Sequence, residues 1–549
     1  MRQSRAYFRD HAVPVYLEGL KKTGITLDRI PLISEIDARL SELGWGAVPV
    51  CGFIPPAAFL DFQARRILPI AYDMRSVDHI HYTPAPDIVH EAAGHAPIIA
   101  DPDYAEYLTL YASMAQKAIF SQEDMNLYEA IRVLSDLKEN PDSTPGKISS
   151  AETELERRAG AVQFISEANK VARMNWWTVE YGLVGSLKDP KIYGAGLLSS
   201  VSESQNCLSD KVRKIRLSID CVNTTYNITE PQPQLFVADD LHHLTETLKE
   251  FEGTLAYSRG GIYGLEQAKR GATVTTTALD SGAEISGRLV EFVAASSHHD
   301  QVEFLRYDGP VQLAAAGKEL AGQGVKEHAL GFSTPLGRWR NAAGKDPSRL
   351  SDLELRDAGL AVGKRATLAF ENGFVVDGNV TSLTRHAGRL IGIKWRDCQV
   401  TRAGKTYFEP AWGDFDMAVG TTVVSVFGGP ADRESYGSHE EGRATTTPGR
   451  QSPFTSHEKK AFERYAEVRR LRPSSPAHAA SVGDLSDKIA VEFKDEWLLR
   501  LESIELMLAA GERKRAAALS LALLNDTKNV PDDTKSMIKQ GLALAGIPD

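Results

Sequence analysis

The stretch TPAPDIVHEAAGHAPIIADPDYAEY, residues 83–107, decides the interpretation of the chain because it carries two histidines five positions apart. His90 and His95 enclose Glu91 and Gly94. In the HExxH motif of zinc proteases the histidines are four apart, about 40° around an α-helix, whereas a spacing of five gives about 140°. The stretch is therefore not that motif. One ion can still bind both rings if the helix bends or ends near Gly94, a conformationally permissive residue.

A third candidate ligand lies in MNWWTVEYGL, residues 174–183, where Glu180 stands among apolar side chains. Burying a carboxylate there is costly unless it is paired or bound to a metal. By spacing alone, His90 and His95 could equally be polar residues near a helix end with ordinary hydrogen-bond partners. With Glu180 they form the two-histidine, one-carboxylate set that leaves three positions on Fe(II) open for dioxygen chemistry. The same set also suits zinc, so both metals stay open at this point.

Residues from about 12 to 270 show the periodicity of helices joined by loops that contain Pro and Gly. Two segments are typical. FLDFQARRILPIAYDM, residues 59–74, has apolar residues at helical spacing, and residues 238–256 open with acidic side chains that suit a helix N-terminus. A polar break at Asn140–Ser150 predicts an exposed loop between two helices.

The texture changes near Gly271, where short β-branched and aromatic runs alternate with Gly, Asp and Asn. This pattern is typical of strands, and ENGF (371–374) and VDGN (376–379) predict hairpin turns. The stretch that follows the strands is rich in Gly, Ser, Thr and Pro, which predicts a linker. Beyond it, residues 496–526 predict a helical hairpin broken at Ala510–Gly511, which is too short to identify a repeat array.

We therefore expect a multidomain α+β chain. A length of 549 residues favours three or four domains. The candidate metal ligands all fall in the first, mainly α region. The expected boundaries are 1–270 for that region, 271–428 for a β-rich domain of unknown role, 429–455 for a linker and 456–549 for a helical C-terminal region.

The bulk composition limits the possible partners and compartment. The net charge of −10 argues against nucleic acid. The four cysteines form no CxxC pair, so we expect neither a disulfide framework nor a structural zinc cluster, and a reducing cytoplasm fits. The N-terminus lacks a signal-peptide pattern, and no apolar run reaches the length of a membrane span. The adjacent pairs His242–His243 and His298–His299 are expected at the surface, since neighbouring side chains point apart.

At this point the sequence resembles the tetrahydropterin-dependent aromatic amino acid hydroxylases. Four blocks carry the resemblance, occur in the family's order and fall within about residues 35–260: TPAPDIVHEAAGHAP (83–97), NWWTVEYGL (175–183), IYGAGLLSSVSE (192–203) and YNITEPQPQLFVADDL (226–241). The resemblance implies the family's mainly α catalytic fold. It also implies a site for iron, for tetrahydrobiopterin or a similar tetrahydropterin, and for a free aromatic amino acid.

The resemblance further implies roles for individual residues. His90, His95 and Glu180 would hold the iron. Arg75, fifteen residues before His90, would pair with the substrate carboxylate, a role that suits the fork of a guanidinium. Hydroxyl groups at the amino acid end and walls around the substrate ring would come from Thr83, Ser199, Pro86 and Trp176. A stacking aromatic, its neighbouring loop and a nearby carboxylate would bind the pterin: Phe59, Gly52, Ile54 and Glu91.

Plain structural roles stay open for the same residues. They are a surface ion pair for Arg75, core packing for Trp176 and Phe59, a helix cap for Thr83, a turn for Ser199 and a solvated carboxylate for Glu91. Asp87 is expected to cap the helix or to support a ligand, without itself binding the metal.

The sequence departs from the family's pattern in several places. His95 and Glu180 are 85 residues apart, which is longer than usual and predicts an insertion at about 127–160 that covers the site or forms an interface. Asn175 stands where many members have tyrosine. Neither the N-terminal regulatory domain nor the C-terminal tetramerisation helix of the animal enzymes is expected. Residues 271–549 lie outside the resemblance and have no predicted function.

We therefore expect an iron- and tetrahydropterin-dependent monooxygenase that uses O2 to hydroxylate the ring of a free aromatic amino acid in the cytoplasm. Phenylalanine is the first expected substrate, because the short catalytic unit resembles phenylalanine hydroxylases best, while tryptophan and tyrosine stay open. Two other classes remain. A zinc hydrolase could use the same three ligands, and a non-catalytic scaffold could bind an amino acid without turnover. The oligomeric state is not predicted.

Overall fold

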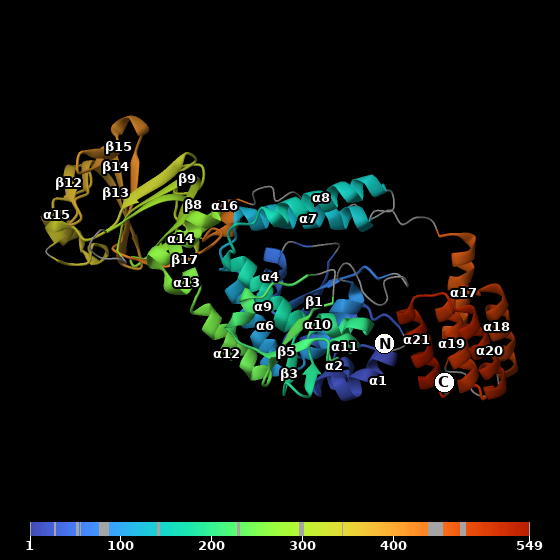
Figure 1. The fold of residues 1–549 in the computed structure, drawn as a ribbon. Coiled ribbons are helices and arrows are strands. Elements are labelled where there is room, and N and C mark those ends of the chain that lie inside the picture. Colours follow the sequence, from blue (N-terminus) through green and yellow to red (C-terminus); the bar gives the residue numbers. More distant parts are fainter. Residues whose placement is uncertain are drawn as a thin grey trace.

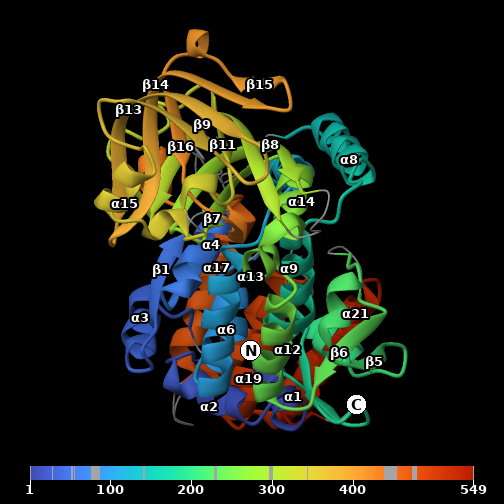
Figure 2. The ribbon, with the colours of Figure 1, turned by 90° about the vertical axis from the view of Figure 1, so that its left-hand side faces the viewer.

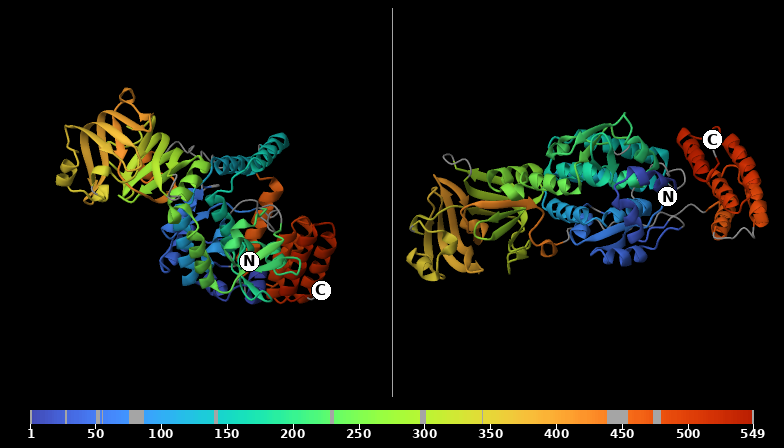
Figure 3. Two further views of the ribbon diagram at one scale, coloured as in Figure 1. Left: turned by 60° about the vertical axis from the view of Figure 1, so that its left-hand side comes forward. Right: turned by 90° about the horizontal axis from the view of Figure 1, so that it is seen from below.

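Three parts are distinguished along the chain in the computed structural model (Figure 1). The helical N-terminal half lies in the middle. The strands that follow Gly271 lie at one end, and the C-terminal helices lie on the other side of the N-terminal half (Figure 1, Figure 3). The residues that the structure describes are 2–26, 29–50, 54, 56–75, 87–139, 143–227, 231–295, 301–342, 344–437, 454–472 and 479–547.

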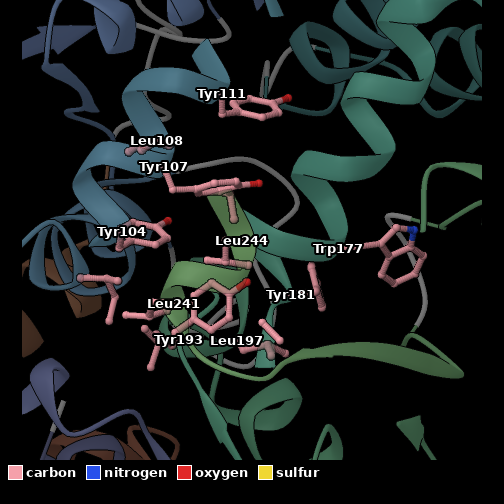
Figure 4. Packing of buried hydrophobic residues seen from close by; sticks show 14 of the residues in the cluster. Tyr104, Tyr107, Leu108, Tyr111, Trp177, Tyr181, Tyr193, Leu197, Leu241 and Leu244 are labelled. Atoms are coloured by element: carbon pink, nitrogen blue, oxygen red, sulfur yellow. The ribbon is translucent and has the colours of Figure 1, made fainter. Parts of the chain in front are cut away.

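Helices make up most of the N-terminal half, as predicted, and most of them pack around one hydrophobic core. Tyr104, Tyr107 and Tyr111 follow one face of α6 within this core, with Tyr193 beside them (Figure 4). The helices are α1 (Arg2–His11), α2 (Val15–Lys22), α3 (Ile33–Ser41), α4 (Pro56–Ala64), α5 (Ala96–Ile98), α6 (Pro102–Ala115), α7 (Gln122–Glu139), α8 (Pro145–Gly160), α9 (Glu167–Asn175), α10 (Ala195–Ser199), α11 (Val201–Asn206), α12 (Leu241–Glu252), α13 (Ala256–Arg259) and α14 (Gly261–Gly271).

Two small sheets accompany these helices. One pairs β1 (Gly46–Val50) with β2 (Ile67–Ala71) in parallel. The other has the order β4-β3-β6-β5. Its strands are β3 (Leu183–Gly185), β4 (Pro190–Ile192), β5 (Arg213–Arg216) and β6 (Gln234–Ala238).

The helix predicted for residues 59–74 is wrong in its second half. Helix α4 ends at Ala64, Arg66 adopts a positive φ of 58°, and β2 follows at once. The sequence ILPIA in β2 is an almost wholly buried apolar run, and such a short run fits a strand as well as a helix. Its parallel pairing with β1 decides in favour of the strand.

The β-branched runs after Gly271 form strands, as predicted. They make two antiparallel sheets, one with the order β10-β9-β8-β7-β17 plus β11 on β9, the other with the order β12-β13-β14-β15 plus β16 on β14. The core of the first sheet also includes Ala256, Leu265 and Ala268 from α13 and α14. The strands are β7 (Val274–Leu279), β8 (Ala283–Ala294), β9 (Val302–Ala315), β10 (Lys318–Glu319), β11 (Gly331–Pro335), β12 (Arg365–Ala369), β13 (Val375–His386), β14 (Arg389–Arg402), β15 (Lys405–Phe408), β16 (Phe415–Ala418) and β17 (Val423–Gly428).

One of the two predicted hairpin turns is wrong. ENGF joins β12 to β13, as predicted. VDGN lies inside β13, where the register with β14 shifts between Asp377 and Asn379. The turn that follows uses Ala387 and Gly388 at φ values of 46° and 79°, the pair of positive φ values that a type I′ hairpin turn needs. The glycine at 378 therefore marks a β-bulge, which Asp-Gly composition alone does not distinguish from a turn.

Helices α7 and α8 form a hairpin that projects from the N-terminal half (Figure 1, Figure 2). The predicted break at 140–150 is shorter than expected. Thr144 caps α8, and Pro145 occupies its first turn, a position that proline favours, so that residues 145–150 are helical. Residues 140–142 lie outside the described part of the chain.

The described residues of the C-terminal region form five helices, in line with the helical structure predicted there. They are α17 (Ser456–Leu471), α18 (Ala479–Glu492), α19 (Trp497–Ala509), α20 (Arg513–Asp526) and α21 (Asp532–Leu544). The predicted hairpin is α19 and α20, broken at Ala510–Gly511. The predicted linker begins with ordered structure, because α16 (Arg433–Tyr436) buries Tyr436, whereas residues 438–453 lie outside the described part of the chain.

Three smaller expectations can be compared with the structure. Among the described residues, no helix is long and apolar enough to cross a membrane. Cys207, Cys221 and Cys398 are buried free thiols. His242 is exposed as expected, but His243 is mostly buried, and its Nδ1 accepts the backbone N–H of Asp239 at 3.1 Å beside the first turn of α12. The pair at 298–299 lies outside the described residues.

Candidate metal centre

His90 and His95 lie on η2 (His90–His95), a single π-helical turn in which the N–H of Ala96 bonds the carbonyl of Glu91, five residues earlier. Bonding between residues five apart brings such residues onto the same helix face, unlike the tighter α-helix. The two Nε2 atoms are accordingly 3.1 Å apart. The expectation that the helix bends or ends near Gly94 is wrong, because the helix widens instead.

Small side chains allow η2 to lie against α10. A Cβ on Gly94 would stand 2.7 Å from the carbonyl oxygen of Ala195 and 3.0 Å from its Cβ. Glycine at this position is therefore required by a close approach of two helices, in which its missing side chain matters more than its flexibility. The approach brings Ser199, at the end of α10, to the histidines.

Glu180 lies at the end of a second π-helical turn, η3 (Trp176–Glu180), which continues directly from α9. Its carboxylate oxygens are 3.4 Å from Nε2 of His90 and 3.3 Å from Nε2 of His95. The three ligand atoms all lie within 4.8 Å of one another. Burial raises the pKa of Glu180, but the two imidazoles beside it lower it by more, so that the net shift of the pKa is well below the usual range. The predicted triad therefore converges on one point.

Ser199 fixes the orientation of the His90 ring. Its Oγ donates to the carbonyl of Ala195 at 2.8 Å and lies 3.0 Å from Nδ1 of His90. The hydroxyl hydrogen of Ser199 is already donated to Ala195, so Oγ can only accept, and it accepts the Nδ1–H of His90. The lone pair on Nε2 of His90 is then left to face the other two candidate ligands. Ser199 is therefore more than a turn residue, because its hydroxyl orients the ring of His90.

Arg75 and Asp87 form a buried ion pair beside the histidines, each side chain only 4% exposed. Nε and Nη2 of Arg75 donate to the two carboxylate oxygens at 2.8 and 2.7 Å, and Nη1 donates to the carbonyl of Ser199 at 2.9 Å. Asp87 also accepts the backbone N–H of His90 at 3.0 Å, so it caps the ligand-bearing helix as expected. Burial raises the pKa of Asp87, but the hydrogen bonds and charge of Arg75 lower it by more, so that the net shift of the pKa is downward. The surface ion pair considered for Arg75 is wrong.

Trp176 lies at the start of η3, half-buried between two tyrosines. Its ring stacks on Tyr181 at a centroid distance of 4.6 Å and on Tyr226 at 4.4 Å. Tyr226 was missed as a site residue, although it stands in one of the blocks that carry the family resemblance. The three rings are therefore stacked on one another, and Tyr181 directly follows Glu180 in the chain.

The pterin residues predicted from the resemblance are only partly described. Phe59, at the middle of α4, and Ile54 are half-buried. Glu91 is fully buried, its Oε2 is 3.9 Å from Nε2 of His95, and burial raises the pKa of its carboxyl to about 7. The solvated carboxylate considered for Glu91 is therefore wrong. The remaining predicted site residues lie outside the described part of the chain: Gly52, Thr83 and Pro86.

Comparison with known proteins adds a family likeness to this geometry. Residues 4–116 and 159–263 match the model of a family described as biopterin-dependent aromatic amino acid hydroxylases. The match begins at α1, earlier than the expected start near residue 35. The unmatched residues 117–158 include α7 and most of α8, and the insertion at about 127–160 stays a prediction.

Two relatives illustrate the similarity, each over less than half of this chain. Phenylalanine-4-hydroxylase of Chromobacterium violaceum is 29% identical over 42% of this chain and 63% of that protein. Phenylalanine-4-hydroxylase of Bos taurus is 30% identical over 45% of each. The chain thus spans less than two thirds of the length of either relative. A structure of the C. violaceum enzyme with bound iron(III) and oxidised 7,8-dihydrobiopterin is 26% identical, with a TM-score of 0.36, over 46% of this chain and 77% of that one.

Proposed function

We propose that this chain, whose residues 4–116 and 159–263 belong to the family of biopterin-dependent aromatic amino acid hydroxylases, hydroxylates the ring of a free aromatic amino acid, with phenylalanine as its first substrate. The convergence of His90, His95 and Glu180 from two π-helical turns carries the proposal. The relatives named phenylalanine-4-hydroxylase support the choice of substrate.

The three ligands fit a metal ion. Nε2 of His90 presents a lone pair because its Nδ1–H is given to Ser199, and the carboxylate of Glu180 is held ionised by the imidazoles. Acceptors that converge on one point repel one another unless a cation lies between them. Two imidazoles and a carboxylate on one side leave room for further ligands, which suits Fe(II). Bound iron and a reduced pterin would together supply the two-electron activation of dioxygen.

The substrate site proposed here uses Arg75 for the carboxylate of the amino acid. The bonds described above use three of its five N–H groups, and the guanidinium stays charged throughout. The pairing with Asp87 holds the guanidinium of Arg75 in one orientation, so that a bound carboxylate would be held in one position. Trp176 is proposed as a wall for the aromatic ring, and its stacking on Tyr181 and Tyr226 keeps that wall rigid. Thr83, Pro86 and Ser199 complete this proposed site.

The proposed pterin site uses Phe59 for stacking, with Gly52, Ile54 and Glu91 around it. Glu91 supports this role because it is a buried carboxyl near the metal ligands whose Oε2 accepts no hydrogen bond from the described residues. A buried acceptor without a donor is costly, and a ring N–H of a bound pterin would satisfy it.

The setting and the division of the chain are part of the proposal. Buried free thiols support a reducing cytoplasm, and the net charge of −10 supports a small-molecule partner over nucleic acid. The core of the second sheet and the core of the C-terminal helices support the expected domains at 271–428 and 456–549, with the linker 429–455 between them. The core of the first sheet is shared with α13 and α14, so the boundary proposed at 271 divides one core.

Product analysis tests the proposed function directly. The full chain with Fe(II), a tetrahydropterin and O2 should convert phenylalanine to tyrosine, and omission of the pterin or of O2 should abolish the product. Tryptophan and tyrosine, supplied separately, test the alternative substrates. Zinc in the protein with activity that ignores pterin and O2 would favour a hydrolase. Amino acid binding without any product would favour a scaffold.

A further inference from the structure

Helix α2 lies directly against the segment that carries the two histidines. A Cβ on Gly19 would come within 1.9 Å of the carbonyl oxygen of Pro97, so the two backbones are in contact. One turn earlier on α2, the hydroxyl of Tyr16 donates to the carbonyl of Ala93 at 2.9 Å. Tyr16 is 1% exposed, and its ring packs edge-to-face on Phe8 at 5.3 Å. The bond therefore lies wholly inside the protein.

The carbonyl of Ala93 has a specific reason to need this donor. In an α-helix it would accept the N–H of the residue four positions later, which here is Pro97 and has no N–H. Ala93 lies inside η2, two residues before His95, where water does not reach it. A buried carbonyl without a donor is unfavourable, so a side chain from another helix is needed to satisfy it. The hydroxyl of Tyr16 meets that need.

We propose that Tyr16 is a positioning residue for the metal centre, whose hydroxyl holds the carbonyl of Ala93 and so keeps η2 in the wide turn that brings His90 and His95 to one ion. The inference rests on the proposed function, because it requires that the triad binds a metal. Burial raises the pKa of Tyr16, which keeps its hydroxyl a hydrogen-bond donor at neutral pH. In the tighter α-turn the same two histidines would point about 140° apart.

The test compares two buried tyrosines in the full chain. Tyr16→Phe removes the bond to Ala93 and keeps the ring. Tyr436→Phe is the matched control, because Tyr436 is 3% exposed and its hydroxyl also donates to a backbone carbonyl, that of Pro310 at 2.7 Å, far from the metal ligands. Co(II) serves as the probe, since its visible absorption reports the ligand geometry. Affinity is measured by titration calorimetry, and folding is followed by urea unfolding.

Both variants should lose stability by similar amounts, but only Tyr16→Phe should bind Co(II) more weakly, by about five- to tenfold as expected for one hydrogen bond, with an altered absorption band. Unchanged affinity and absorption in Tyr16→Phe would overturn the inference and leave the proposed function intact. A wild-type chain that binds neither Co(II) nor Fe(II) would overturn the proposed function itself.

A second variant keeps the inference testable if Tyr16→Phe does not fold. In the double variant Tyr16→Phe, Pro97→Ala, the new N–H of residue 97 can satisfy the carbonyl of Ala93 in an α-type bond. This variant should fold, but it should still bind Co(II) weakly, because an α-type bond favours the tighter turn. Wild-type affinity in the folded double variant would show that Tyr16 contributes packing alone.

Discussion

At the scale of single residues, the candidate site is built as much by supporting groups as by the three ligands. Asp87 illustrates this, because one carboxylate caps the helix at His90 and fixes the guanidinium of Arg75. Ser199 also contacts both residues, because its hydroxyl accepts from Nδ1 of His90 and its carbonyl accepts from Nη1 of Arg75. The proposed substrate placement and the geometry of the proposed metal ligands are therefore expected to be linked through these two residues, and single substitutions should separate them only in part.

Arg75→Lys tests the guanidinium. A lysine keeps the positive charge but cannot donate to Asp87 through a planar fork and to Ser199 at the same time. We expect the KM for the aromatic amino acid to rise by about 10- to 100-fold, the size expected for a lost charged hydrogen bond, with a smaller change in kcat. Steady-state kinetics at saturating Fe(II) measures this. Arg216→Lys is the control, because Arg216 pairs with Asp239 on the exposed surface. An unchanged KM in Arg75→Lys would contradict the proposed role.

Ser199→Ala tests the support of His90. Without the hydroxyl, Nδ1 of His90 loses its acceptor and the ring loses its fixed orientation, so we expect metal affinity to fall by about 10- to 100-fold. The neighbouring Ser200→Ala is the control. Ser200 caps α11 by accepting the N–H of Glu203, so its loss should cost about 1 kcal/mol of stability without a change in metal affinity. Equal metal affinity in the two variants would contradict the proposal that Ser199 orients the ring of His90.

At the scale of elements, both ligand-bearing segments are π-helical turns at the ends of ordinary helices. A spacing of five residues misleads when it is projected on an α-helix, because the sequence carries no sign of the wider turn. Reasoning from residue types nevertheless selected the three side chains that converge in the structure, since a buried carboxylate and two histidines together are an unusual set. The helix predicted for residues 59–74 was wrong for the opposite reason. Its apolar pattern was correct, but pairing between distant strands, which no local pattern contains, determined its structure.

Gly94→Ala tests the contact between η2 and α10. The added Cβ would meet the backbone of Ala195 at 2.7 Å, and backbone on both sides cannot move aside easily. We expect a loss of about 1–3 kcal/mol in unfolding free energy together with weaker metal binding. The control is Gly146→Ala in α8, where a Cβ meets nothing within 4 Å and alanine should stabilise the helix by up to about 1 kcal/mol. Urea unfolding of both variants measures these changes in free energy. An unchanged unfolding free energy in Gly94→Ala would contradict the close packing of η2 on α10.

Glu167 anchors α9, the helix that leads to Glu180. Its buried carboxylate accepts the N–H of Ile119 at 3.2 Å and the N–H of Ala256 at 2.6 Å. A glutamine offers one acceptor for these two donors, so Glu167→Gln should lower the unfolding free energy by about 1–3 kcal/mol. The exposed Glu129→Gln serves as control and should change it by less than about 0.5 kcal/mol.

The pH dependence of this effect has a definite sign. Burial raises the pKa of Glu167 above its ordinary value, although the two N–H groups oppose the shift. The folded state therefore holds this proton more tightly than the unfolded state, and the related stability is complete in acid and falls as pH rises through the raised pKa. The gap in unfolding free energy between wild type and Glu167→Gln should narrow from pH 4 to pH 8 in urea titrations. A gap that widens over this range would rule out the raised pKa.

At the scale of the whole molecule, the strand region and the last five helices are attached to the N-terminal half in different ways. The loop between α6 and α7 gives two carbonyls to the first sheet, that of Lys117 to Gly428 and that of Phe120 to Thr273. Among the described residues, helix α21 meets the N-terminal half through two side-chain bonds, from Gln3 to the carbonyl of Met537 at 2.8 Å and from Gln205 to Gln540 at 3.4 Å. The sequence predicted the order of these parts along the chain. Their attachment could not be predicted, because it depends on isolated polar contacts between distant segments.

Metal binding should accordingly stabilise one part of the chain more than the others. The triad lies within the core of the N-terminal half, whereas the C-terminal helices have a core of their own that contains Leu499, Ile504 and Leu523. A metal at about 100 times its dissociation constant adds about 2.7 kcal/mol to the state that binds it. Hydrogen exchange with and without Co(II) should therefore show slower exchange in η2, α9 and η3 and unchanged exchange in α19 and α20. Equal slowing in both regions would mean that the chain unfolds as one cooperative unit, and no slowing in either would exclude a metal centre at the triad.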